Sequence, residues 1–292
     1  MAGRTEIETL FKSEKYAATF KRGEIVTRTF AESLVDQSKI CTESKANPDQ
    51  PLVILDNACG TGVVSSVLNI KVNETAKKRW KLTCGDIAPA VLAYTEQRMQ
   101  EEGWVNAETK VLDAQKPDLP SDSYTHIFSS FVYMALPESI KALDETVRML
   151  QPGGTIAFST WIEPGWVSVA RRVIESMPGN LPFPDVEKVV TGMSDGYWNS
   201  ESWIKAQLEE RGLQEINVCV EKDRLTLTPS IFLEMTMLIL PIMLTSVWTE
   251  EQRKENADNI RPALERYLKN TFGDGDIETE WVAILSTARK SR

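Results

Sequence analysis

The sequence has few of the residues that bind zinc or form disulfide frameworks. It contains one histidine, His126, and four scattered cysteines without a CxxC pair, at Cys41, Cys59, Cys84 and Cys219. A structural zinc site needs four closely spaced Cys or His ligands, and a disulfide framework needs a regular set of paired cysteines. We therefore predict no metal, no disulfides and a reducing, cytoplasmic compartment.

The sequence also lacks an excess of positive charge and a clean membrane-spanning run. Lys and Arg number 33 against 42 Asp and Glu, which gives a net charge of −9. This charge repels polyanions, so we predict no nucleic-acid partner. The apolar stretch 231–247 contains Glu234 and Pro241 and falls short of the about 20 apolar residues that span a bilayer. We predict a buried or pocket-covering helix there, no membrane insertion and, from the charged N-terminus, no secretory signal.

Apolar runs and helical spacings alternate along the chain. Strands are predicted at 52–56, 80–86, 107–114, 124–130, 155–161, 213–222 and 280–287. Helices are predicted at 4–38, 62–76, 88–102, 138–150, 200–211, 230–245 and 249–270. In 88–102 we expect four residues to face inward, namely Ala90, Leu92, Ala93 and Met99. Such alternation is typical of a parallel sheet covered on both faces. The predicted fold is α/β, a Rossmann-like, doubly wound, seven-stranded and mainly parallel sheet, with 162–199 as an irregular insertion.

A glycine loop follows the first predicted strand, in LDNACGTG (residues 55–62). Gly60 and Gly62 lack a Cβ, so the chain can turn sharply there and let a ligand approach the main chain. In open parallel sheets, ligands bind beyond the carboxyl ends of the strands. The loop is therefore the predicted binding site.

Two cofactors compete for this loop. A dinucleotide site has the pattern GxGxxG, but Ser65 occupies the place of the third glycine. An acid at the strand end, Asp56, is unfavourable beside a pyrophosphate and favourable beside an ammonium group. A ligand with an ammonium, a carboxylate and a nucleoside but no phosphate is S-adenosylmethionine, whose carboxylate suits a helix N-terminus. The charges favour S-adenosylmethionine.

Two more acids follow the next strands. Asp86 ends the second predicted strand, where a carboxylate can accept both ribose hydroxyls, although a dehydrogenase also places an acid there. Asp113 ends the third, where it could accept from the adenine amine, with the Ala114 amide nearby. One acid at a strand end is commonly only solvated. Three in succession behind a glycine loop predict a nucleoside site.

These stretches resemble the motifs of class I S-adenosylmethionine-dependent methyltransferases. The matching segments across 50–161 are LDNACGTG, CGD, VLDA with LPSDSYTHIFSS, and LQPGG. The chain is more closely similar to fungal thiomethyltransferases of secondary metabolism, of the gliotoxin bis-thiomethyltransferase type. That similarity lies in VLNIKVNETAKKRWKLTCGD, EEGWVNAETK, PGNLPFP and VWTEEQR. It implies S-methylation of a small thiol or dithiol such as a reduced epidithiodiketopiperazine, with the cofactor under a helical cover.

The resemblance also implies an organisation and a set of site residues. We expect one domain, 1–292, with an N-terminal helical segment (1–45), a cofactor-binding core (50–161) and an acceptor-pocket cover (162–199 and 229–270). The predicted cofactor-binding residues are Asp56, Ala58, Cys59, Gly60, Gly62, Asp86, Ile87, Asp113, Ala114, Ser129, Tyr16 and Phe20. Tyr16 and Phe20 are expected to close over the cofactor or simply to pack between helices, and Cys59 is expected to be structural.

The acceptor side is predicted from aromatic residues. Phe131, Tyr133, Trp161 and Trp166 follow the fourth and fifth predicted strands and are the candidate substrate-binding residues, with core packing as the alternative for each. His126 lies early in its strand, away from the ligand end, so we expect it to pack against a neighbouring helix and not to act as a base. A thiol with a pKa of about 8.5 is already partly ionised near neutrality and requires no dedicated base. No catalytic residue is therefore assigned.

The chain departs from the family pattern in two places, and other functions stay open. Tyr124-Thr125-His126 stands where an acid is usual at the start of the fourth strand, and SSFVYM replaces the (N/D)PP(Y/F) motif of nucleobase amino-methylation. The alternatives are O- or N-methylation of a phenol or amine and a non-catalytic methyltransferase-like scaffold. An NAD-dependent oxidoreductase is disfavoured by Ser65 and Asp56. The sequence does not determine the oligomeric state.

Overall fold

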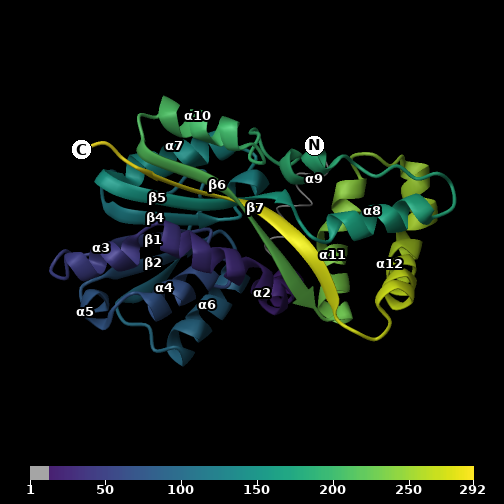
Figure 1. Ribbon diagram of the computed structural model, residues 1–292, viewed down its shortest axis with the longest axis horizontal. Coiled ribbons are helices and arrows are strands. Elements are labelled where there is room, and N and C mark those ends of the chain that lie inside the picture. Colours follow the sequence, from purple (N-terminus) through teal and green to yellow (C-terminus); the bar gives the residue numbers. More distant parts are fainter. Residues whose placement is uncertain (1–12) are drawn as a thin grey trace.

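The computed structural model describes residues 13–292, which form a seven-stranded sheet between two layers of helices (Figure 1). The order of strands across the sheet is β3-β2-β1-β4-β5-β7-β6. The strands are β1 (Val53–Asn57), β2 (Lys81–Asp86), β3 (Ala107–Val111), β4 (Tyr124–Ser130), β5 (Leu150–Glu163), β6 (Gln214–Leu227) and β7 (Ile277–Arg289). The predicted Rossmann-like sheet is confirmed.

The connections of the sheet determine where a ligand can bind. β1 to β5 pair in parallel, and only β7 is antiparallel to its neighbours β5 and β6. The chain moves outward from β1 through β2 to β3 and then returns to β4 on the other side of β1. A crevice forms at such a reversal, beyond the carboxyl ends of the strands. The β1 loop, which carries the glycines, lies at this point.

Helices cover the two faces unequally (Figure 1). One face is covered by α7 (Ser139–Met149) and α10 (Glu201–Glu210). The other carries α2 (Glu14–Gln37), α3 (Ile40–Ala46), α4 (Val63–Lys71), α5 (Glu74–Lys77) and α6 (Pro89–Glu101). Both sheet faces are apolar, which explains the continuous apolar runs of the central strands.

A second group of helices lies at one end of the sheet (Figure 1). These helices are α8 (Val167–Ser176), α9 (Val186–Thr191), α11 (Pro229–Leu244) and α12 (Glu250–Phe272), and a short 3-10 helix, η1 (Tyr133–Ala135), follows β4. Helix α12 begins with a capping box between Thr249 and Gln252. Helix α11 packs closely on α2, since a Cβ on Gly23 would overlap the side chain of Met235. Among residues 13–292, no helix is long and apolar enough to span a bilayer.

The structure corrects several local predictions. The predicted helix 62–76 is divided into α4 and α5, because the chain is extended at Val72 and restarts at the cap Asn73. The insertion 162–199 is not irregular throughout, since it contains α8 and α9. β3 ends at Val111, earlier than predicted. The N-terminal part of predicted helix 4–38, with Ile7, Leu10 and Phe11, lies outside the described residues.

The inward face of α6 also differs from the prediction. Ala93 is exposed, whereas Thr95 and Arg98 are buried along with Val91 and Leu92. An apolar pattern assigns small and aliphatic residues to the buried side. Besides β2 and β3, α6 packs against the glycine loop and α2. The loop offers a carbonyl to Thr95, and α2 offers the Glu24 carboxylate to Arg98.

Candidate functional site

The glycine loop after β1 has a left-handed backbone at three positions. The φ angles are 58° at Ala58, 56° at Gly60 and 75° at Gly62. A residue with a Cβ is disfavoured in this backbone conformation. Gly60 and Gly62 adopt it without strain because they lack a Cβ, whereas the backbone of Ala58 is strained. The Cys59 amide donates to the carbonyl of Gly85 over 2.9 Å and thereby joins the loop to β2. The loop is held as a compact turn beyond the strand ends.

Asp86 is positioned directly against this loop. Its Oδ2 accepts from the Gly60 amide over 2.9 Å, and its Oδ1 accepts from the Ala88 amide over 2.9 Å. Burial raises the pKa of the carboxyl group, and the amide hydrogen bonds act in the opposite direction. Each carboxylate oxygen has a second lone pair, so the group can still accept two ligand hydroxyls. The neighbouring Ile87 is exposed beside it.

Asp56 points instead to the start of α4. Its Oδ2 accepts from the Ser65 amide over 3.1 Å and from the Ser65 hydroxyl over 2.6 Å, and its side chain is 1% exposed. Burial raises the pKa of Asp56 to about 6. Ser65, which the sequence indicates only as a missing glycine, is therefore the partner of this acid. A contact of Asp56 with a ligand ammonium stays a prediction.

The third acid and its neighbours lie at the adjacent strand ends. Asp113 is half-buried two residues after β3, and its Oδ1 accepts from the Gln115 amide over 2.9 Å. Ala114 is buried next to it, and Ser129 is buried near the end of β4. These residues surround the same edge of the sheet as the glycine loop.

Two aromatic residues of α2 lie over the loop. The rings of Tyr16 and Phe20 stack with their centroids 5.6 Å apart. A Cβ placed on Gly60 would be 3.2 Å from Cε1 of Phe20. Burial raises the pKa of Tyr16, and the nearby charge of Asp86 raises it further. The structure thus brings Tyr16 and Phe20 together with Gly60 and Asp86.

An aromatic cluster follows β4 and β5. Phe131 stacks on Trp161 with ring centroids 3.9 Å apart, and Phe30 contacts both rings edge-on. Trp281 of β7 lies 5.5 Å from Trp161. Phe131 has a φ of 56°, an uncommon value for a non-glycine residue, and its amide donates to the carbonyl of Ser159 over 2.9 Å. Strained residues of this kind concentrate at functional sites.

Sequence reasoning missed Phe30 and Trp281. Both were assigned to predicted elements, a helix and a strand, but about 250 residues separate them along the chain. Their helical and strand periodicities indicate burial only, and no local signal joins them to Phe131.

Tyr133 and Trp166 are not part of the aromatic cluster. Tyr133 is 0% exposed, donates its hydroxyl to Thr146 over 2.9 Å and stacks on Trp198. Trp166 is buried in the hydrophobic core at the start of α8. Both side chains pack in the core in this structure.

His126 lies at the beginning of β4, and burial lowers its pKa from 6.5 to about 3. Its Nδ1 is 3.1 Å from the Thr125 hydroxyl, and its ring stacks beside Phe128. The imidazole is therefore neutral near neutral pH.

We expect His126→Ala to change the pH dependence of stability and to leave turnover within about threefold. Between pH 6.5 and about 3 the unfolded chain holds a proton on His126 that the folded chain lacks. Relative to the variant, the wild type should lose about 1.4 kcal/mol of unfolding free energy per pH unit as the pH falls through this window. Asp56 titrates in both proteins and cancels in the difference. Urea unfolding at several pH values measures this, and parallel curves for the two proteins would refute it.

Comparison with known proteins identifies similar chains. Residues 54–154 match the model of a methyltransferase domain. The whole chain is similar to the acetylaranotin bis-thiomethyltransferase of Aspergillus terreus, with 39% identity over 98% of each chain. It is also similar to methyltransferase tpcH of Aspergillus fumigatus, with 38% identity over 97% of this chain and 99% of the relative. The YcgJ protein of Bacillus subtilis has the same fold, with a TM-score of 0.54, 14% identity and coverage of 90% and 99%.

Proposed function

Because this chain belongs to the methyltransferase family, we propose that it methylates the thiol sulfur of a small molecule of secondary metabolism. The cofactor is S-adenosylmethionine. The proposed acceptor is a reduced dithiol of the epidithiodiketopiperazine type. The observation that supports this acceptor most is the similarity, over nearly the whole chain, to a bis-thiomethyltransferase.

The residues of the cofactor site fit the proposed ligand. Gly60 has no Cβ in its left-handed loop, so a ligand would have to move only the Phe20 ring to reach the main chain there. Asp86 keeps two lone pairs for ribose hydroxyls. Tyr16 and Phe20 would cover the ligand from α2. Bound S-adenosylmethionine would supply the methyl group of its sulfonium. Transfer to a thiolate, whose proton has gone to solvent, would form a thioether and leave S-adenosylhomocysteine.

The acceptor side has to orient the sulfur and needs no proton acceptor. The candidate pocket residues Phe131 and Trp161 are aromatic, and the single histidine is buried and neutral at the other end of β4. Orientation of two reactants contributes several kcal/mol to such a displacement. A thiol with a pKa of about 8.5 supplies its own nucleophile near neutrality. We further propose that 162–199 and 229–270 cover this pocket.

The proposal also covers the partners of the enzyme and its cellular compartment. The substrate is a small molecule, and we propose that nucleic acid is not a partner, since the net charge is −9. The four cysteines are free thiols, which suits the reducing cytoplasm. O- or N-methylation and a scaffold role remain the alternatives that experiment has to exclude.

Mass spectrometry of the protein with S-adenosylmethionine and a dithiol, a phenol or an amine tests the proposed acceptor. We expect a reduced epidithiodiketopiperazine to gain methyl groups on sulfur, at a rate that rises between about pH 6 and about pH 9 as the thiol ionises. The oxidised, disulfide form of the same compound is the matched control and should not react. Methylation of a phenol or amine while the dithiol is ignored would defeat the thiol assignment. No methylation of any acceptor, despite cofactor binding, would favour the scaffold role.

A further inference from the structure

One face of helix α2 is directed at the cofactor loop. Tyr16, Phe20 and Glu24 are spaced four residues apart and therefore lie on one side of the helix. Tyr16 is near Asp86, and Phe20 lies over Gly60. Glu24, one turn further, is the polar member of this row and contacts the loop through its carboxylate.

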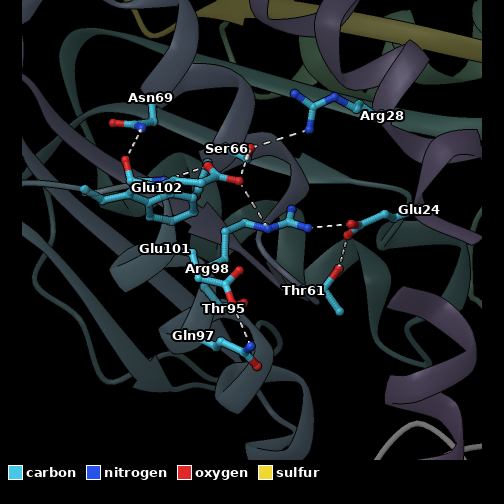
Figure 2. Close-up of polar contacts among 12 residues, drawn as sticks. Glu24, Arg28, Thr61, Ser66, Asn69, Thr95, Gln97, Arg98, Glu101 and Glu102 are labelled. Carbon is cyan, nitrogen blue, oxygen red and sulfur yellow. Dashed lines mark hydrogen bonds and ion pairs between the residues drawn. The ribbon is translucent and has the colours of Figure 1, made fainter. Parts of the chain in front are cut away.

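The Glu24 carboxylate joins three elements of the fold (Figure 2). Its Oε2 accepts from the Thr61 hydroxyl over 2.9 Å, and its Oε1 is ion-paired with Arg98 of α6. Thr61 is fully buried between the two left-handed glycines of the loop. The side chain of Arg98 is 6% exposed, and its Nε lies 3.6 Å from Oε1 of Glu102. Helix α2, the loop and α6 are therefore connected through one carboxylate.

Burial makes this connection stronger than a surface ion pair. An exposed pair contributes little, because water and side-chain entropy compete with it. Here the side chains of Arg98 and Glu24 are only 6% and 19% exposed, and hydrogen bonds to charged groups are stronger than those between neutral groups. Lys21 also contacts Oε1 of Glu24, at 2.8 Å, but it lies on α2 itself and is more exposed. It connects α2 to nothing else.

The loop has an independent support on its other side. The Thr95 hydroxyl donates to the carbonyl of Gly60 over 2.9 Å, so α6 holds the loop even without α2. Helix α2 also packs on α4 and α11, so loss of the Glu24 contacts would loosen the part of α2 over the loop and leave the loop itself in place.

We propose that Glu24 is a positioning residue that fixes helix α2, with Tyr16 and Phe20, across the cofactor loop and thereby slows the release of S-adenosylmethionine. This inference rests on the proposed function only for the identity of the ligand. A purely structural role would lower the thermal stability and leave the release rate unchanged.

Two variants break the connection from opposite sides. Thr61→Val removes the hydroxyl while keeping the branched shape and the Glu24–Arg98 pair, and Glu24→Gln removes the charge. Stopped-flow displacement of bound S-adenosylmethionine by excess S-adenosylhomocysteine measures the release rate. We expect release to be about tenfold faster in each variant. The two effects should not multiply in the double variant, because both substitutions weaken the connection that passes through the Glu24 carboxylate.

Two controls keep the chemistry and the location similar. Thr61→Ser retains the hydroxyl, and Lys21→Met removes the other cation at the same carboxylate oxygen; both should stay within about twofold of the wild type. Thermal unfolding of each variant shows whether the protein is folded at the assay temperature. If Glu24→Gln is unfolded there, the release rate of Thr61→Val alone tests the proposal.

The outcomes separate this inference from the proposed function. Wild-type release rates in folded Thr61→Val and Glu24→Gln, or effects that multiply in the double variant, would overturn the positioning role. Failure of the wild type to bind S-adenosylmethionine would instead overturn the proposed function.

Discussion

Gly60→Val is expected to abolish S-adenosylmethionine binding in a protein that remains folded. Gly60 has a φ of 56°, which a β-branched residue strongly disfavours, and its Cβ would be 3.2 Å from the Phe20 ring. The added methyl groups would displace the Phe20 ring and occupy the position at which the ligand has to approach the main chain. Isothermal titration calorimetry should detect no binding where the wild type binds, a loss of about a hundredfold or more.

Gly103→Val is a matched control for backbone strain. Gly103 has a similar φ, 62°, but follows α6 at the surface, where an added Cβ meets no atom within 4 Å. Its substitution carries the same conformational cost and should leave cofactor affinity unchanged. Normal binding by Gly60→Val, with a native circular dichroism spectrum, would mean that the glycine is required only for the turn.

Asp86→Ala is expected to weaken S-adenosylmethionine binding at least tenfold. The substitution would remove the pair of charge-assisted hydrogen bonds that we propose Asp86 accepts from the ribose, worth about 1.5 to 3 kcal/mol. It also removes the acceptor of the Gly60 amide, so the loop loses an anchor at the same time. Calorimetry measures the dissociation constant directly.

Asp258→Ala provides the same chemical change away from the site. Asp258 is exposed on α12, and its substitution should not affect cofactor affinity. Asp86→Asn retains one acceptor oxygen and should lie between the wild type and Asp86→Ala. Unchanged affinity of a folded Asp86→Ala protein would show that another group holds the ribose.

Substitutions in helix α2, which covers the glycine loop, and substitutions in the loop itself should have different effects on cofactor binding. Tyr16 and Phe20 reach the loop from α2, and the link between Glu24 and Thr61 holds that helix in place. A variant that loosens α2 should raise the rates of cofactor release and cofactor entry together, whereas one that removes a ligand contact should raise the release rate and the dissociation constant together. Rates and dissociation constants measured together therefore distinguish the two kinds of residue.

The sequence by itself determined the fold and the location of the cofactor loop. The central strands follow from short continuous apolar runs and the helices from an apolar spacing of 3.6 residues, which are local properties of the chain. The glycine loop is likewise a contiguous segment, residues 55–62, whose shape depends on its own residue types. Asp86 and Asp113 could be predicted because parallel strands bring their carboxyl ends to one edge.

Only the tertiary structure decided which side chains meet across distant elements. Glu24 contacts Arg98 across 74 residues of sequence. Phe30 contacts Phe131, and Trp281, from the opposite end of the chain, contacts Trp161. It also placed Tyr133 in the core and turned Asp56 toward Ser65. Periodicity indicates that a residue is buried but not what it is buried against, because the partner is chosen by how whole helices pack on the sheet. The placement of Tyr16 and Phe20 of α2 over the glycine loop therefore depends on the packing of the whole molecule and cannot be read from the sequence.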